Sequence, residues 1–157
     1  MKEKYIRLRA DAAPDIVEID PENLLQEIYK VIDCDCIETC RGYRDLLGIR
    51  LIVDESGKLK DRPLNHMASF VFNGGDQHAD YIAGTALLAR VGERNGETDL
   101  VPFSDTDTVQ IWDFLLFIWN STMKARKYGE ELAELIVSQL MNPKPEGLEI
   151  NHTTKGE

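Results

Sequence analysis

The stretch that decides the fold is YIRLRADAAPDIVEIDPENLLQEIYKVID, residues 5–33. Apolar and polar residues alternate over residues 5–9, as in a half-buried strand, and residues 16–19 have the composition of a second strand. Asp20-Pro21-Glu22 then marks a helix start, with a capping aspartate, proline at the first helical position and an acid in the first turn. Apolar residues recur at helical spacing to about Asp33. The stretch predicts two strands and an amphipathic helix that packs on a sheet.

The chain continues this pattern to about residue 110. Further strands are expected at residues 36–44, 49–53, 81–90 and 100–101. Residues 63–72 are predicted as a short helix opened by Pro63, with a strand as the alternative. At 157 residues the chain is long enough for one hydrophobic core. We therefore expect an α+β domain over residues 1–110, built on a small mixed or antiparallel sheet.

The C-terminal part has a different character. Capping residues are dense at 104–107 and a long helix follows, apolar on nearly all sides around Trp112 and Trp119. Such a helix needs cover from the domain or from a second subunit, and we expect a homo-oligomer. Another amphipathic helix is expected after Tyr128-Gly129, ending before Pro143. The prediction is C-terminal helices over residues 104–142 and a polar, disordered tail over 143–157.

Composition limits the partners and the compartment. The chain has 28 Asp and Glu against 18 Lys and Arg, a formal charge of −10. Such an excess opposes binding to phosphate polyanions and anionic lipid, so we expect no direct nucleic-acid contact. The longest apolar run is six residues, 114–119, and no apolar leader precedes the first strand, so no membrane is expected either. Three cysteines, an odd number, fit a reducing compartment, and we expect a cytoplasmic protein.

Motifs of catalysis are missing from the sequence. Cys34, Cys36 and Cys40 could bind zinc or carry redox chemistry, but no second pair of ligands follows at a suitable distance. On an extended strand their even spacing would place them on one face, which favours core packing. The three histidines are scattered, and no P-loop, dinucleotide fingerprint or nucleophile elbow is present. We expect no cofactor, no metal and no enzyme, although a hydrolase assembled from distant residues stays open.

Positive charge is concentrated in residues 41–62, against the overall balance. The Lys and Arg residues there are Arg41, Arg44, Arg50, Lys58, Lys60 and Arg62. Guanidinium groups hold phosphate or carboxylate in a bidentate manner, and an aromatic side chain can stack on a base. The alternative is a solvated sheet face laced with ion pairs. The predicted ligand-binding residues, which combine guanidinium, amide and aromatic groups, are Arg7, Arg9, Arg44, Arg62, Asn65, Tyr81 and Arg90.

Five short motifs, in order, suggest a family. They are Leu24-Leu25-Gln26, residues 32–38, residues 53–58, Arg62-Pro63-Leu64-Asn65-His66-Met67-Ala68 and Ile82-Ala83-Gly84-Thr85-Ala86. Together they resemble small uncharacterised domains frequent in phages and mobile elements of gut-associated Gram-positive bacteria, which carry a Leu-Pro-Leu-Asn-x-x-Ala motif. The likeness runs from about Tyr5 to Val109. The chain departs from it at Cys34 and Asp35, where the family has two glycines, and at Asp54, where it has asparagine.

The resemblance implies a setting rather than a mechanism, because it brings no catalytic residues. Small phage proteins of this kind often act by binding, and some sequester nucleotide signals of bacterial immunity. We therefore expect a non-enzymatic protein that captures a phosphate-bearing small molecule. The alternative is an acidic protein-interaction or DNA-mimic module that inhibits a host enzyme.

Overall fold

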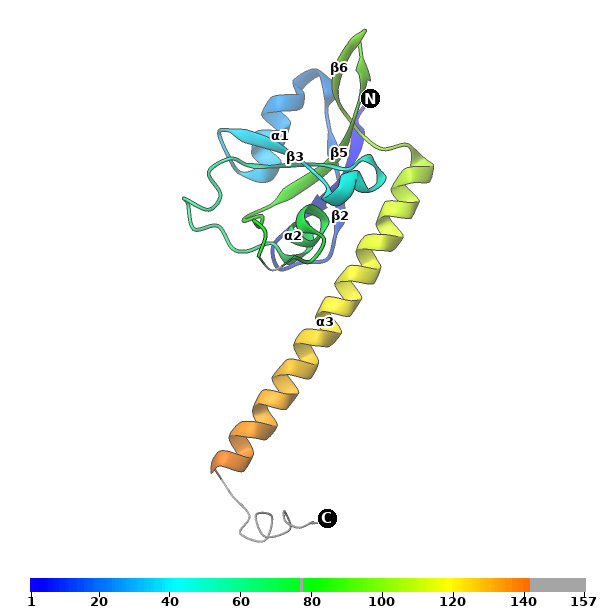
Figure 1. Cartoon of the computed structure of the whole chain (residues 1–157). Helices are drawn as coiled ribbons and strands as arrows, with labels where there is room; N and C mark the ends of the chain where they lie inside the picture. Colours follow the sequence, from blue (N-terminus) through cyan, green and yellow to red (C-terminus); the bar gives the residue numbers. More distant parts are fainter. Residues whose placement is uncertain (77, 142–157) are drawn as a thin grey trace. The chain divides into compact units, whose positions relative to one another are not determined.

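The structure, a computed structural model, describes residues 1–76 and 78–141. It contains six strands, three α-helices and two short 3-10 helices (Figure 1). In chain order they are β1 (Glu3–Leu8), β2 (Asp15–Ile19), η1 (Pro21–Asn23), α1 (Leu24–Ile32), β3 (Ile37–Arg41), η2 (Tyr43–Gly48), β4 (Arg50–Asp54), α2 (His66–Asn73), β5 (Ala86–Arg94), β6 (Glu97–Val101) and α3 (Asp105–Met141).

The strands form one antiparallel sheet in the order β2-β1-β5-β4-β3. The far half of β5 pairs with β6, beyond the part that pairs with β1 and β4. Antiparallel pairing suits a sheet whose strands follow one another through turns. The α+β prediction is confirmed, and of the two sheet types expected the antiparallel one is present.

Each face of the sheet has its own core. On one face Ile28 and Ile32 of α1 pack with a cluster that includes Tyr5, Ile52 and Leu87. On the other face α2 and the first part of α3 contribute to a cluster with strand residues; its helical members are Met67, Ala68, Val71, Ile111, Leu115 and Ile118. Both faces are covered because consecutive strand residues point to opposite sides.

Several predicted elements differ from the observed ones. The strand expected over 36–44 ends at Arg41, because residues 43–48 form a tight turn with left-handed backbone at Arg44, Asp45 and Leu47. The strand expected over 81–90 begins only at Ala86. The helix α2, His66–Asn73, covers most of residues 63–72, which confirms the helical prediction there.

The C-terminal helices expected over 104–142 are one continuous helix, α3. Gly129 does not break it, since one glycine costs a helix only about 1 kcal/mol relative to alanine and strong helix formers flank it. Residues up to Trp119 belong to one compact unit, Met1–Trp119, and a second unit begins at Asn120. The tail prediction for 143–157 falls outside the described residues. Across the part of the chain that is described, no helix has the length and apolar character to cross a bilayer.

Candidate functional site

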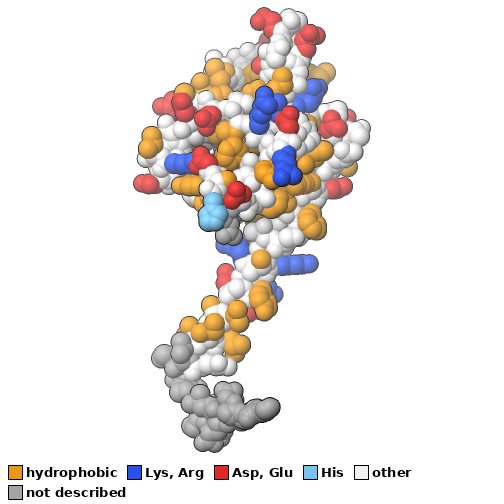
Figure 2. All heavy atoms as spheres, in the orientation of Figure 1, with side chains coloured by type: hydrophobic (Ala, Val, Ile, Leu, Met, Phe, Trp, Pro, Cys, Tyr) orange, Lys and Arg blue, Asp and Glu red, His pale blue; other side chains and the backbone are white. Residues whose placement is uncertain are grey.

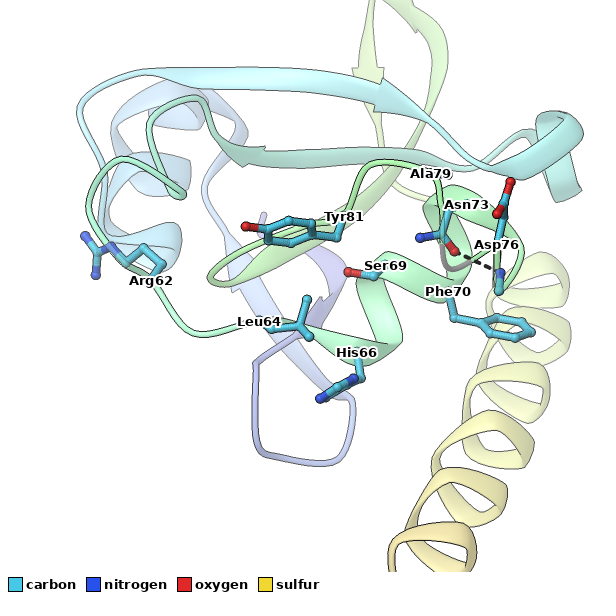
Figure 3. A pocket seen from close by; sticks show the side chains of 10 residues that line it. Arg62, Leu64, His66, Ser69, Phe70, Asn73, Asp76, Ala79 and Tyr81 are labelled. Atoms are coloured by element: carbon cyan, nitrogen blue, oxygen red, sulfur yellow. Dashed lines mark hydrogen bonds between the residues drawn. The ribbon is translucent and has the colours of Figure 1, made fainter.

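A cavity of about 530 Å³ lies beside α2, in the unit Met1–Trp119. Its walls come from the segment before α2, from one side of α2 and from the loop that returns to β5 (Figure 3). The lining residues are Arg62, Leu64, His66, Ser69, Phe70, Asn73, Gly75, Asp76, Ala79 and Tyr81. Chain segments more than ten residues apart thus form one concave surface.

Three large apolar side chains stay open to solvent in this cavity. Leu64 is 42% exposed, Phe70 41% and Tyr81 45%. Figure 3 shows Tyr81 across the cavity from Leu64 and His66. An apolar lining with a few polar groups is the usual character of a small-molecule site.

Asn65 fixes the start of α2 and therefore one wall of the cavity. Its side chain is fully buried, and its Oδ1 accepts a hydrogen bond of 3.0 Å from the N–H of Ala68, as an N-cap does. Its Nδ2 donates to the carbonyl oxygens of Leu8 and Gly84, each at 2.9 Å. One amide thus ties α2 to β1 and to the segment before β5.

Ser69 and Asn73, on the cavity side of α2, hold the loop that forms the opposite wall. The Ser69 hydroxyl accepts from the N–H of Ile82 at 2.9 Å and donates to its carbonyl at 3.3 Å. Asn73 donates to the carbonyl of Asp80 at 3.0 Å and accepts from the N–H of Gly75 at 2.8 Å. Their hydrogen-bonding groups serve the fold, which leaves His66, Arg62 and Asp76 as the other polar side chains of the lining.

Arg62 lines the cavity and Lys58 lies against the ring of its lining residue Tyr81, and each cation already has a carboxylate partner. The Arg62 guanidinium donates to Asp33 Oδ2 at 3.1 Å and to the Asp33 carbonyl at 2.7 Å, and its Nε lies 3.8 Å from Asp54. In Figure 3 this guanidinium points away from the other lining side chains. Lys58 lies over the Tyr81 ring, 4.6 Å from its centroid, and pairs with Asp80, whose pKa it lowers by that hydrogen bond.

The cavity brings some of the predicted ligand residues together. Arg62 and Tyr81 line it. Asn65 lies at the base of α2 with its side chain committed to internal hydrogen bonds. Arg9 shares a second cavity of about 280 Å³ with Arg62, on the side of Asp33 and Gly84.

The other predicted arginines lie elsewhere. Arg7, on β1, donates from Nε to Asp15 at 2.9 Å. Arg44 lies over its neighbour Tyr43, 5.1 Å from the ring centroid, and Arg90 lies in β5 opposite Val101. None of the three lines the cavity beside α2.

Neither Phe70 nor His66 was among the residues that the sequence predicted to bind a ligand. Both lie on α2 but off its buried residues Met67, Ala68 and Val71. An apolar ring off the buried stripe of a short helix was the available signal. That signal alone does not indicate a binding site, because Leu64 and Tyr81 come close to Phe70 only in the folded chain.

The three cysteines do not share one face, contrary to the extended-strand reading. Cys34 packs with the α1-side core and Cys40 with the other, while the exposed Cys36 donates to Glu55 at 2.7 Å. The reason is that β3 begins only at Ile37, after a left-handed residue at Asp33. Burial, with Glu38 nearby, raises the pKa of Cys40 to about 11. Within residues 1–76 and 78–141 no three Cys, His, Asp or Glu side chains form a metal-binding group.

Comparison with known proteins gives a family. The family model described as "Domain of unknown function (DUF3846)" matches residues 1–111. No curated protein and no solved structure matches the chain.

Proposed function

The chain belongs to the DUF3846 family, a domain of unknown function, and we propose that it binds a small molecule in the cavity beside α2. The ligand class that fits is a planar ring carrying an anionic group, as in a nucleotide. The observation that carries the proposal is that Leu64, Phe70 and Tyr81, all more than two-fifths exposed, line one cavity.

The apolar walls suit the ring. Phe70 and Tyr81 have aromatic faces for stacking, and a base stacked on an aromatic side chain gains about 1–3 kcal/mol. Lys58 holds the Tyr81 ring from one side, 4.6 Å from the centroid. Because the tyrosine ring is fixed in this way, less rotamer freedom is lost when a ligand stacks on it.

The anionic group is assigned to the start of α2. The first N–H groups of a helix have no carbonyl partner within it and attract negative charge. Asn65 caps the N–H of Ala68, and His66, the first residue of α2, adds an imidazole on the cavity wall. The Arg62 guanidinium is a weaker candidate, because it is paired with Asp33 and Asp54.

Capture rather than conversion is the proposed activity. The Ser69 hydroxyl, the cavity's own alcohol nucleophile candidate, is held in two hydrogen bonds with Ile82. The resemblance to phage and mobile-element domains supplies a role for capture, namely sequestration of a nucleotide immune signal. We therefore propose that the captured ligand is such a signal.

The alternative function is that of an acidic protein-interaction or DNA-mimic module. Ion pairs with Arg or Lys neutralise many carboxylates, among them Glu3, Asp15, Asp45, Asp80 and Asp99. Figure 2 shows acidic and basic side chains interspersed on the face it presents. A mimic of DNA needs an array of charges of one sign. The mixed charges seen here do not form such an array, so the cavity gives the stronger argument and favours a small ligand.

Calorimetry against mononucleotides, cyclic nucleotides and ADP-ribose derivatives tests the proposal. We expect binding at tens of micromolar or tighter for a member of this panel. Phe70→Ala and Tyr81→Ala each weaken it about tenfold or more, the equivalent of about 1.4 kcal/mol. His66→Ala weakens binding of the phosphorylated ligand and leaves the affinity for the matching nucleoside unchanged.

Phe117→Ala is the matched control, because Phe117 is 73% exposed on α3 and does not line the cavity. This variant keeps the affinity of the parent chain. Ligand recovered intact after denaturation of the complex supports capture, and recovery of a cleaved product contradicts it. If no member of the panel binds, the proposal is overturned. A host enzyme that is captured in a pull-down, and whose binding weakens as salt rises, then favours the interaction module.

A further inference from the structure

The described part of the second unit is a single helix, so nothing within that unit covers its apolar side chains. Among residues 120–139 of α3 only Thr122 is even half-buried. The large apolar side chains exposed there are Met123, Tyr128, Leu132, Leu135, Ile136 and Val137. Exposed apolar surface of this extent on one helix marks an interaction site.

One seam of α3 continues from the core of the first unit into this exposed part. Ile111, Leu115 and Ile118 are spaced by four and three residues and are buried. The same alternation of three and four continues through Thr122, Ala125, Gly129, Leu132 and Ile136. A repeat of this kind is the seam of a coiled coil.

We propose that residues 120–139 of α3 pair with the same residues of a second copy, in antiparallel orientation. Antiparallel pairing sets Ala125 opposite Ile136 of the other copy and Gly129 opposite Leu132. Each small residue then faces a large one, so the two helices approach closely around Gly129 and fill the seam without voids.

Charge selects the orientation. Lys124, Arg126 and Lys127 precede Gly129, while Glu130, Glu131 and Glu134 follow it. Apart from Arg126, which flanks the seam, these residues lie off it, so the attraction is between oppositely charged halves of the two helices. Antiparallel helices place the basic half of each copy beside the acidic half of the other, whereas parallel helices place like charges together. The occupant with the complementary charge pattern is therefore a second copy of this segment.

The interface lies beyond the two tryptophans from which an oligomer was expected. Trp112 and Trp119 pack against the core of their own unit. The pairing is independent of the cavity beside α2, which is lined by residues between Arg62 and Tyr81.

Sedimentation of the full chain over a range of concentrations tests the pairing. We expect a species of twice the 17.8 kDa chain mass. Ile136→Glu and Gly129→Leu each weaken dimerisation at least tenfold. Gly129→Leu is the sharper variant, because it raises helix propensity while blocking close approach, so loss of the helix cannot explain its effect.

Met123→Glu is the matched control, since Met123 is also exposed but lies off the seam. This variant stays dimeric, and circular dichroism shows helix content retained in all three. Raising the salt concentration weakens the antiparallel dimer, because it screens attraction. A wild-type chain that is monomeric at 100 micromolar, an Ile136→Glu variant that dimerises normally, or association that strengthens with salt would each overturn the proposal. Nucleotide affinity unchanged in Ile136→Glu separates this result from that of the cavity.

Discussion

Asn65 is the residue on which the geometry of the cavity depends most. Its amide caps α2 and satisfies the carbonyl oxygens of Leu8 and Gly84 inside the protein. Asn65→Ala removes the cap and leaves two buried acceptors without a donor, at an expected cost of about 2–4 kcal/mol in the free energy of unfolding. Urea denaturation measures it.

Asn23→Ala is the control for that measurement. Asn23 is exposed and donates only to the neighbouring Asp20, at 3.1 Å. Its replacement should change the free energy of unfolding by less than about 0.5 kcal/mol. Equal effects of the two substitutions would show that Asn65 has no special structural role.

Glu3 contributes a stabilisation of the folded protein that is lost at acid pH. Arg94 donates to both of its carboxylate oxygens, at 2.8 and 3.0 Å, and Tyr5 donates to Oε2 at 2.8 Å. The hydrogen bonds from Arg94 lower the pKa of Glu3. A lowered pKa means that this stabilisation is present above the unfolded pKa of about 4.3 and is lost as the pH falls through the folded value.

Glu3→Gln therefore lowers the free energy of unfolding at pH 7 by about 1–2 kcal/mol. The difference from the wild type narrows as the pH falls below about 4.3. Chemical denaturation at pH 7, 5 and 3 measures it. A difference that is constant over this range would assign the loss to packing instead of charge.

At the scale of elements, the first part of α3 belongs to the domain. Leu115 is fully buried in the core beneath β4 and β5, while Phe117, two residues on, is 73% exposed. Leu115→Ala should lower the free energy of unfolding by about 2–5 kcal/mol, whereas Phe117→Ala should have a small effect. Thermal unfolding distinguishes them, and similar effects would mean that α3 does not hold the sheet.

The elements that could be predicted are those whose signals are local. The alternation at Tyr5–Leu8 and the cap at Asp20 led to β1, β2 and α1, and Pro63 led to α2, which begins three residues later at His66. The strands expected at residues 81–90 and 100–101 fall on β5 and β6 but end too far from the turn between them, although Asn95-Gly96 is a two-residue turn with both φ angles positive. In the sequence, Glu93, Arg94 and Glu97 around it resemble a solvated loop, because the partners of Arg94, which are Glu3 and Asp99, meet it only in the fold.

At the scale of the whole molecule, the site could be predicted only in part. Local arginine density in residues 41–62 pointed to Arg62, and Tyr81 was named as a stacking residue. The carboxylates that occupy Arg62 come from residues 33 and 54, and Phe70 joins Tyr81 only through the packing of α2. Ion pairing and concavity arise from the fold, and no spacing in the sequence encodes them.

Mapping the ligand by amide chemical shifts is the most direct test of the central claim that the cavity beside α2 binds an anionic planar ligand. With the tightest nucleotide of the panel, we predict the largest shifts in the amides of the two segments that contain the lining residues, 62–76 and 79–81. Shifts centred on Arg9, Asp33 and Thr85, which line the second cavity, or no shifts at a saturating concentration, would contradict it.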